Sequence, residues 1–160
     1  MIKYIGIFIL SCSISLYGAV LSNILKEKHA IKKEITILLK NIERSILYNS
    51  KSCIDTVRQC NLPLLEKSGF CKNFSGCENA TITINTHLSS LDAEDRNMLC
   101  EFFSKLGKSS FCEYELKNLK YCLDYFEKSL ADSEKSVNTK VILYKKIGLL
   151  AGILAAIIFI

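Results

Sequence analysis

The chain has 160 residues, 49% of them hydrophobic, and its 21 Lys and Arg against 16 Asp and Glu give a net charge of +5. This length accommodates about one domain, and one proline with seven glycines favours long helices over a turn-rich β architecture. The small charge excess, with no basic stripe interleaved with aromatic residues, argues against nucleic acid as a partner.

The first predicted element is a transmembrane helix within 1–25. Positions 4–25 hold no charged residue and are rich in Ile, Leu, Phe and Val. A helix of this length measures about 33 Å, which matches a hydrocarbon core of about 30 Å. A signal peptide cleaved near Gly18, or a lipoprotein signal ending at Cys12, is the alternative. Because the apolar run continues past both positions, a membrane anchor is favoured.

A helix is predicted to continue directly from this anchor over 26–49. Apolar residues recur there at helical spacing, with most charges on other faces: Ile31, Ile35, Leu38, Ile42 and Ile46. Ser52 is the expected N-cap of a short helix that runs toward Gln59. Pro63 favours another helix start, and Gly69 or Gly76 its stop.

Two further helices are predicted in the second half of the middle region. The alternating, β-branched run 81–84 has strand propensity, but a single strand without a partner is implausible, so a helix is expected. The acidic residues that follow Leu91 open a helix that runs to Leu106, with Gly107 as its C′ stop.

The last helix is the most regular stretch of the sequence. Ser110 and Glu113 form a capping box at its start. Positions that are apolar apart from Ser133 then follow in steps of four and three along about 50 Å of helix: Cys112, Leu116, Leu119, Leu123, Phe126, Leu130, Ser133, Val137, Val141 and Tyr144. This spacing indicates a heptad stripe, and an ordinary core-facing stripe gives the same pattern. The first and last helices are expected to pack antiparallel as a stalk.

The segment 147–160 is entirely apolar and is predicted to be a short C-terminal membrane anchor. Its length gives only about 21 Å of helix, so Lys145 and Lys146 are expected to reach back to the headgroups. The length leaves open whether this segment crosses the bilayer or only enters one side of it. A buried hairpin element of a soluble protein is the alternative. Gly148 and Gly152 form a small-residue pair expected to pack against another membrane helix.

The distribution of Lys and Arg residues predicts the orientation of the chain in the membrane. Six Lys and Arg lie within 26–45 and five within 127–146, whereas the far sides of the anchors offer only Lys3. By the positive-inside rule, the domain 26–146 faces the cytoplasm. Seven of the eight cysteines then lie in a reducing compartment and are expected to be free thiols. Disulfides or a zinc site are the alternatives, the latter weakened because His29 and His87 lie far from any cysteine cluster.

The sequence carries no signature of catalysis. No Gly-rich phosphate loop is present, and the paired carboxylates sit at predicted helix starts, where capping and the helix dipole account for them. We therefore expect no enzyme activity, no catalytic residues, no metal and no cofactor. The predicted fold is all-α: a small helical bundle with a long membrane-continuous helix at each end.

Three stretches resemble one family. They are Ile42-Glu43-Arg44-Ser45-Ile46-Leu47-Tyr48, Phe102-Phe103-Ser104-Lys105-Leu106-Gly107, and the terminal run from Tyr144 through Gly148 and Gly152 to Leu154. The pattern, together with the total length, is similar to the stage III sporulation protein AB family. The soluble domain of that family is similar to the cytoplasmic bundles of type II secretion inner-membrane platform proteins.

The resemblance implies a scaffold in a secretion-like channel between mother cell and forespore. It implies a mother-cell protein of the outer forespore membrane, with a secretion-type ATPase and other channel subunits as partners. We predict that charges on the distal helices contact the partner, namely Asp92, Glu94, Asp95 and Arg96, all expected to be exposed. The alternatives are a coiled-coil, self-associating membrane protein of regulatory type and an extracytoplasmic binding module that contains disulfides.

Overall fold

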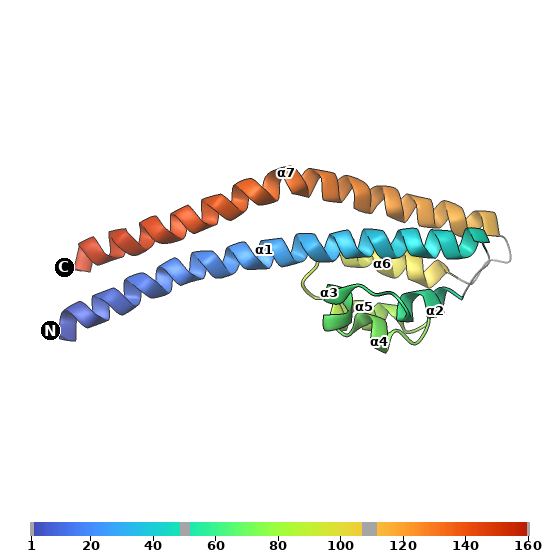
Figure 1. The fold of residues 1–160 in the computed structure, drawn as a ribbon, viewed down its shortest axis with the longest axis horizontal. Coiled ribbons are helices and arrows are strands. Elements are labelled where there is room, and N and C mark those ends of the chain that lie inside the picture. The colour runs from blue at the N-terminus through green and yellow to red at the C-terminus, as the bar shows by residue number, and fades with distance from the viewer. Residues whose placement is uncertain (1, 49–51, 107–111, 160) are drawn as a thin grey trace. The chain divides into compact units, whose positions relative to one another are not determined.

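A computed structural model of the chain describes residues 2–48, 52–106 and 112–159. Within these residues it has seven helices and no strand (Figure 1). The helices are α1 (Ile2–Tyr48), α2 (Cys53–Arg58), α3 (Pro63–Lys67), α4 (Phe70–Asn73), α5 (Ala80–His87), α6 (Ala93–Lys105) and α7 (Cys112–Phe159). The predicted all-α fold with a long helix at each end is confirmed.

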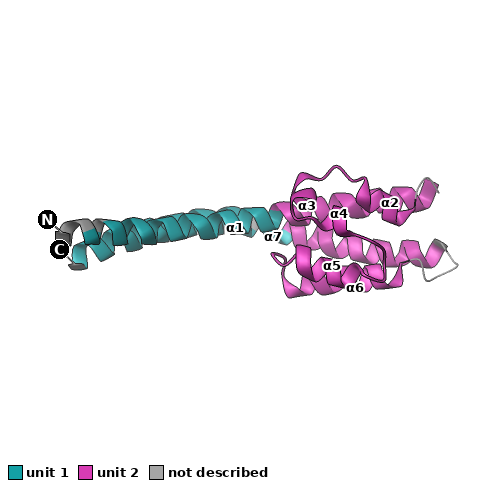
Figure 2. Ribbon diagram, turned by 90° about the horizontal axis from the view of Figure 1, so that it is seen from below, with its two compact units in different colours: residues 1–29, 132–160 teal, residues 30–131 magenta. Residues whose placement is uncertain are grey.

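The chain divides into two compact units, shown in different colours in Figure 2. Unit 1 consists of 1–29 and 132–160, and unit 2 consists of 30–131. In unit 1, parts of α1 and α7 lie side by side, and α1 begins at the end of the unit where α7 finishes (Figure 2). Unit 2 is shorter at both ends than the predicted domain 26–146, whose limits at a bilayer stay a prediction.

The two long helices have 47 and 48 residues, and each passes without a break through both units. The prediction that a helix continues from the N-terminal apolar segment is therefore confirmed. The periodicity also placed the core face of α1 correctly, because Ile31, Ile35, Leu38 and Ile42 are all buried. In α7, Leu119, Leu123 and Phe126 are buried in the core of unit 2. Over these residues the stripe is a core-facing one.

The short helices begin and end where local chemistry predicts. The Ser52 side chain accepts a hydrogen bond from the backbone N–H of Ile54 and caps α2. Proline occupies the start of α3, where its missing N–H costs nothing. Gly69, with φ of 82°, lies between α3 and α4 in the left-handed region that glycine adopts without strain.

One helix cap comes from a distant residue. The N-cap position of α3 is Leu62, which has no side-chain acceptor. Instead, the Glu34 carboxylate on α1 accepts hydrogen bonds from the backbone N–H groups of Leu64, at 3.0 and 3.1 Å, and Leu65, at 2.9 Å. These are N–H groups that a helix start leaves without partners, and a carboxylate there also complements the helix dipole. Glu34 therefore ties α3 to α1.

The run 81–84 is helical, as expected, despite its strand propensity. It lies in α5, whose Ala80, Thr83 and Ile84 are buried against the rest of unit 2. Helix α6 begins after Asp92 and ends with Leu106 as its C-cap. The predicted stop at Gly107 and the capping box at Ser110 fall outside the described residues.

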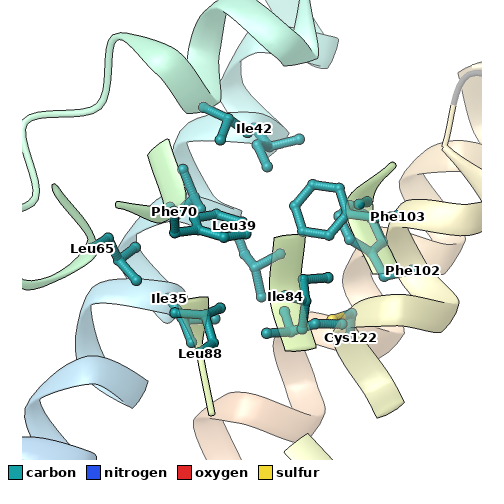
Figure 3. Packing of buried hydrophobic residues seen from close by; sticks show 14 of the residues in the cluster. Ile35, Leu39, Ile42, Leu65, Phe70, Ile84, Leu88, Phe102, Phe103 and Cys122 are labelled. Atoms are coloured by element: carbon teal, nitrogen blue, oxygen red, sulfur yellow. The ribbon is translucent and has the colours of Figure 1, made fainter. Parts of the chain in front are cut away.

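Phenylalanines fill the centre of unit 2. Figure 3 shows Phe70, Phe102 and Phe103 among aliphatic residues from α1, α3 and α5. The rings of Phe74 and Phe103 lie 5.0 Å apart, as do those of Phe102 and Phe103, in tilted or edge-to-face arrangements. Full burial of one such side chain contributes about 1.5–3 kcal/mol, so these rings join α4 and α6 into one core.

Candidate docking site and membrane-helix contact

Two helical stretches are long and apolar enough to cross a membrane: Ile9–Tyr48 in α1 and Ser136–Ile158 in α7. Their outward faces carry large exposed apolar side chains, such as Leu16 on α1 and Leu150 on α7. They correspond to the two anchors predicted from the sequence and are candidate membrane spans.

The two candidate spans contact each other in unit 1 through residues without bulky side chains. A Cβ atom added at Gly148 would lie 3.0 Å from the Cα atom of Gly18, and one added at Gly152 would lie 2.8 Å from the carbonyl oxygen of Ser11. The Ser11 hydroxyl donates a hydrogen bond to the Gly152 carbonyl at 2.7 Å, and the Ser15 hydroxyl donates to that of Gly148 at 3.4 Å. Small residues let helix backbones approach closely in an apolar medium.

The expected packing partner of Gly148 and Gly152 was another membrane helix. In the structure, both glycines face α1, the helix that contains the other candidate span. Sequence reasoning did not connect them with the serines at positions 11 and 15. The missed signal is that Ser11, Ser15, Gly18 and Ser22 recur at steps of four and three, which puts small residues on one face of α1.

The predicted docking residues lie at the start of α6, and one of them, Asp95, forms a buried ion pair. Lys32 on α1 places its Nζ 2.8 Å from Asp95 Oδ2, with 9% and 2% of the two side chains exposed. Asp95 Oδ2 finds no hydrogen-bond donor among the described residues other than this ammonium group. The Tyr125 hydroxyl on α7 donates to Asp95 Oδ1 at 3.2 Å, and Lys32 donates to the Ser129 hydroxyl at 3.1 Å. The pair therefore joins α1, α6 and α7.

An open depression of about 500 Å³ lies over this ion pair. It is lined by Lys32, Asp92, Ala93, Glu94, Asp95, Tyr125 and Ser129. Asp92 and Glu94 are exposed at its rim, and Asp92 Oδ2 lies 3.7 Å from Lys32 Nζ. Burial, followed by the charge and hydrogen bond of Asp95, raises the pKa of Tyr125 to about 12. Tyr125 is therefore a neutral hydrogen-bond donor at physiological pH.

The structure corrects part of the sequence prediction for this site. Asp95 was expected to be exposed, but only 1% of its surface is accessible because its charge is compensated by Lys32 inside the protein. Arg96 donates to the carbonyls of Ser89 at 2.9 Å and Leu91 at 3.3 Å, so it closes the turn before α6. Asp92 and Glu94 are exposed on the surface, as expected. Lys32 was missed because its spacing in the sequence matches that of a solvated charge.

Metal ligands are not gathered in the part of the chain that the structure describes: no group of three or more His, Cys, Asp or Glu there could hold an ion. The two histidines have separate surroundings. His29 Nδ1 lies 3.1 Å from the Ser133 hydroxyl in unit 1, and His87 Nδ1 lies 2.8 Å from the Ser68 carbonyl in unit 2.

Comparison with known proteins gives one finding. Neither the curated proteins nor the solved structures include a match to this chain. The family model of stage III sporulation protein AB matches residues 3–160, which is nearly the whole length. This agrees with the resemblance carried by the three sequence stretches and with the helical fold between two apolar ends. The chain therefore belongs to the stage III sporulation protein AB family.

Proposed function

We propose that this protein is a non-enzymatic scaffold that holds a helical docking domain at a membrane during sporulation. The observation that carries the proposal is the continuity of α1 and α7, each of which runs unbroken from a candidate span into unit 2. A continuous helix resists bending better than a loop, so two of them tether unit 2 more firmly than a flexible linker would.

The scaffold belongs to a secretion-like channel between mother cell and forespore, with unit 2 on the mother-cell side of the outer forespore membrane. The Lys and Arg residues within 26–45 and 127–146, which lie next to the predicted anchors 1–25 and 147–160, support this orientation. Protease treatment of right-side-out vesicles tests this orientation. Unit 2 is protected if it is cytoplasmic, and digestion of unit 2 would contradict the proposed orientation.

The partner is a secretion-type ATPase, and it docks on the depression at the start of α6. Asp92 and Glu94 present two exposed carboxylates there, while the buried Lys32–Asp95 pair fixes α6 beneath them. A partner with Lys or Arg residues at matching positions would complement this rim. Other channel subunits contact the outward apolar faces of α1 and α7, because the small-residue faces already pack against each other.

Crosslinking in sporulating cells tests the docking. A tagged chain is crosslinked, purified and analysed by mass spectrometry, once as wild type and once as Asp92→Asn with Glu94→Gln. These changes remove both charges and keep the size of both side chains. Recovery of the ATPase should fall about tenfold or more. The matched control, Glu78→Gln with Asp124→Asn, changes two exposed carboxylates elsewhere on unit 2 and should keep full recovery.

Two results would contradict the proposal. Equal ATPase recovery with both double variants would move the docking surface away from the start of α6. Recovery of the tagged chain alone, with no ATPase in the wild type, would remove the docking role and favour a self-associating membrane protein.

A further inference from the structure

Two cysteines of unit 2 lie in direct contact although ten residues separate them in the sequence. Cys60 follows α2 and Cys71 belongs to α4, and their Sγ atoms are 3.0 Å apart. Both side chains are buried, with 6% and 2% of their surface exposed. The Cys60 thiol also donates a hydrogen bond to the Val57 carbonyl at 2.9 Å. The two sulfurs are therefore held in place by the fold.

A polar groove borders one of the two cysteines. Cys60 lines an open groove of about 260 Å³ between α1 and α2, together with Asn41, Arg44, Gln59 and Asn61. Cys71 is not among the lining residues. The amide side chains and the Arg44 guanidinium suit a small polar molecule that carries carboxylates. A reagent in this groove would meet Cys60 first.

The contact also distinguishes the two thiols chemically. A hydrogen bond with Cys71 lowers the pKa of Cys60, because a donor stabilises the thiolate, while burial acts in the opposite direction. The same hydrogen bond, together with burial, raises the pKa of Cys71. Cys60 is therefore the better nucleophile, and Cys71 keeps its proton until Cys60 has reacted.

We propose that Cys60 and Cys71 form a redox-active thiol pair that reacts with a low-molecular-weight disulfide and closes a reversible disulfide within unit 2. The Cys60 thiolate attacks one sulfur of the small disulfide, forms a mixed disulfide and releases one small thiolate. Cys71 then loses its proton to solvent and attacks Cys60 Sγ. The second small thiolate leaves and takes up a proton. The two protein thiols are oxidised, and the small disulfide is reduced to two thiols. This inference rests on unit 2 alone and is independent of the proposed docking role.

A third cysteine in the same region provides an internal comparison. Cys53, at the start of α2, is half-buried, and burial followed by the charges of Glu115 and Cys77 raises its pKa to about 11. Cys53 is therefore a poor nucleophile near neutral pH, although it also has a cysteine nearby. The difference between Cys53 and Cys60 should appear directly in reaction rates.

Oxidation would close a loop around α3. The segment between Cys60 and Cys71 contains all of α3 (Pro63–Lys67). A disulfide there restricts the unfolded chain, so the oxidised protein should unfold roughly 10 °C higher than the reduced one. The Glu34 carboxylate already fixes the other side of α3, so α3 would be tied to both α1 and α4.

Tryptic mapping of the full-length protein in detergent micelles tests the proposal. The reduced protein is incubated with glutathione disulfide, free thiols are alkylated, and the protein is digested with trypsin. Cleavage after Arg58, Lys67 and Lys72 places Cys60 and Cys71 in different peptides, 59–67 and 68–72. The expected product is these two peptides joined by a disulfide that dithiothreitol separates. Failure of the joined peptide to form while Cys60 is still alkylated would overturn the proposal.

Two variants test the order of the steps. In Cys71→Ser, glutathione should remain attached to Cys60, whereas in Cys60→Ser position 71 should react at least tenfold more slowly. The control Cys122→Ser changes a buried cysteine on α7 and should leave the joined peptide intact. Circular dichroism confirms that each variant keeps its helical content. Capture of glutathione at Cys71 rather than Cys60 would reverse the assigned roles.

Discussion

The buried ion pair gives the sharpest prediction for stability. In Lys32→Met, the ammonium group is lost and the Asp95 carboxylate stays buried, with 2% of its side chain exposed. Its remaining hydrogen bond comes from the Tyr125 hydroxyl at 3.2 Å. Methionine has nearly the shape of the lysine stem, so the change removes a charge with little loss of volume. The variant therefore measures the cost of leaving one buried charge without its partner.

The expected cost is large relative to the stability of a small domain. Removing one partner of a buried ion pair costs about 3–5 kcal/mol, whereas typical domains are stable by about 5–15 kcal/mol. The double variant Lys32→Met with Asp95→Leu replaces both charges by apolar groups. Such a replacement is often neutral or stabilising, so the double variant should recover most of the loss.

Chemical denaturation of the full-length protein in micelles, followed by circular dichroism, measures both effects. The matched control is Lys33→Met, which changes the exposed neighbour on α1 and should alter the unfolding free energy by less than about 0.5 kcal/mol. The reasoning would be refuted if Lys32→Met cost less than about 1 kcal/mol, or if the double variant were as unstable as the single one.

Three further predictions concern other contacts. Glu34→Ala removes the distant cap of α3 and should lower the unfolding free energy by about 1–2 kcal/mol, measured by denaturation against Glu34→Gln, which keeps one acceptor. Gly148→Val should lower the midpoint of thermal unfolding in micelles, because its Cβ atom would meet the backbone of α1. The control Gly6→Val, where an added Cβ atom has nothing within 4 Å, should leave the midpoint unchanged. Equal midpoints for the two variants would contradict the close approach of the helices. The raised pKa of Tyr125, about 12 against an ordinary 10.0, means that its contribution to stability is complete below pH 10 and is lost as the pH rises through 12. Tyr125→Phe should therefore show a shallower alkaline decline in a pH series of unfolding curves.

The architecture was predictable because it rests on patterns within single segments. The spacing of Ile31, Ile35, Leu38 and Ile42 shows a core face on α1 without reference to any other part of the chain. The Ser52 cap of α2 and the start of α3 at Pro63 are equally local. Each of these features depends on residues within about three helical turns of one another.

The missed features all depend on contacts between distant segments. Lys32 lies one position from a core residue, and only the approach of α6 shows that its charge has a buried partner in Asp95. Cys60 and Cys71 come together because α3 turns the chain back between them. No spacing rule in the sequence indicates such pairs, since the separation reflects the length of the intervening turn.

The unbroken helix α1 also fixes the angular positions of residues within unit 1. Ser11 and Gly18 on α1 are connected only by helical turns, so each residue added between them would rotate one relative to the other by about 100° around the helix axis. A single insertion there would turn either the serine or the glycine away from α7, whereas seven inserted residues, close to two full turns, would nearly restore the alignment. Length variation in this part of α1 should therefore occur in steps of whole turns.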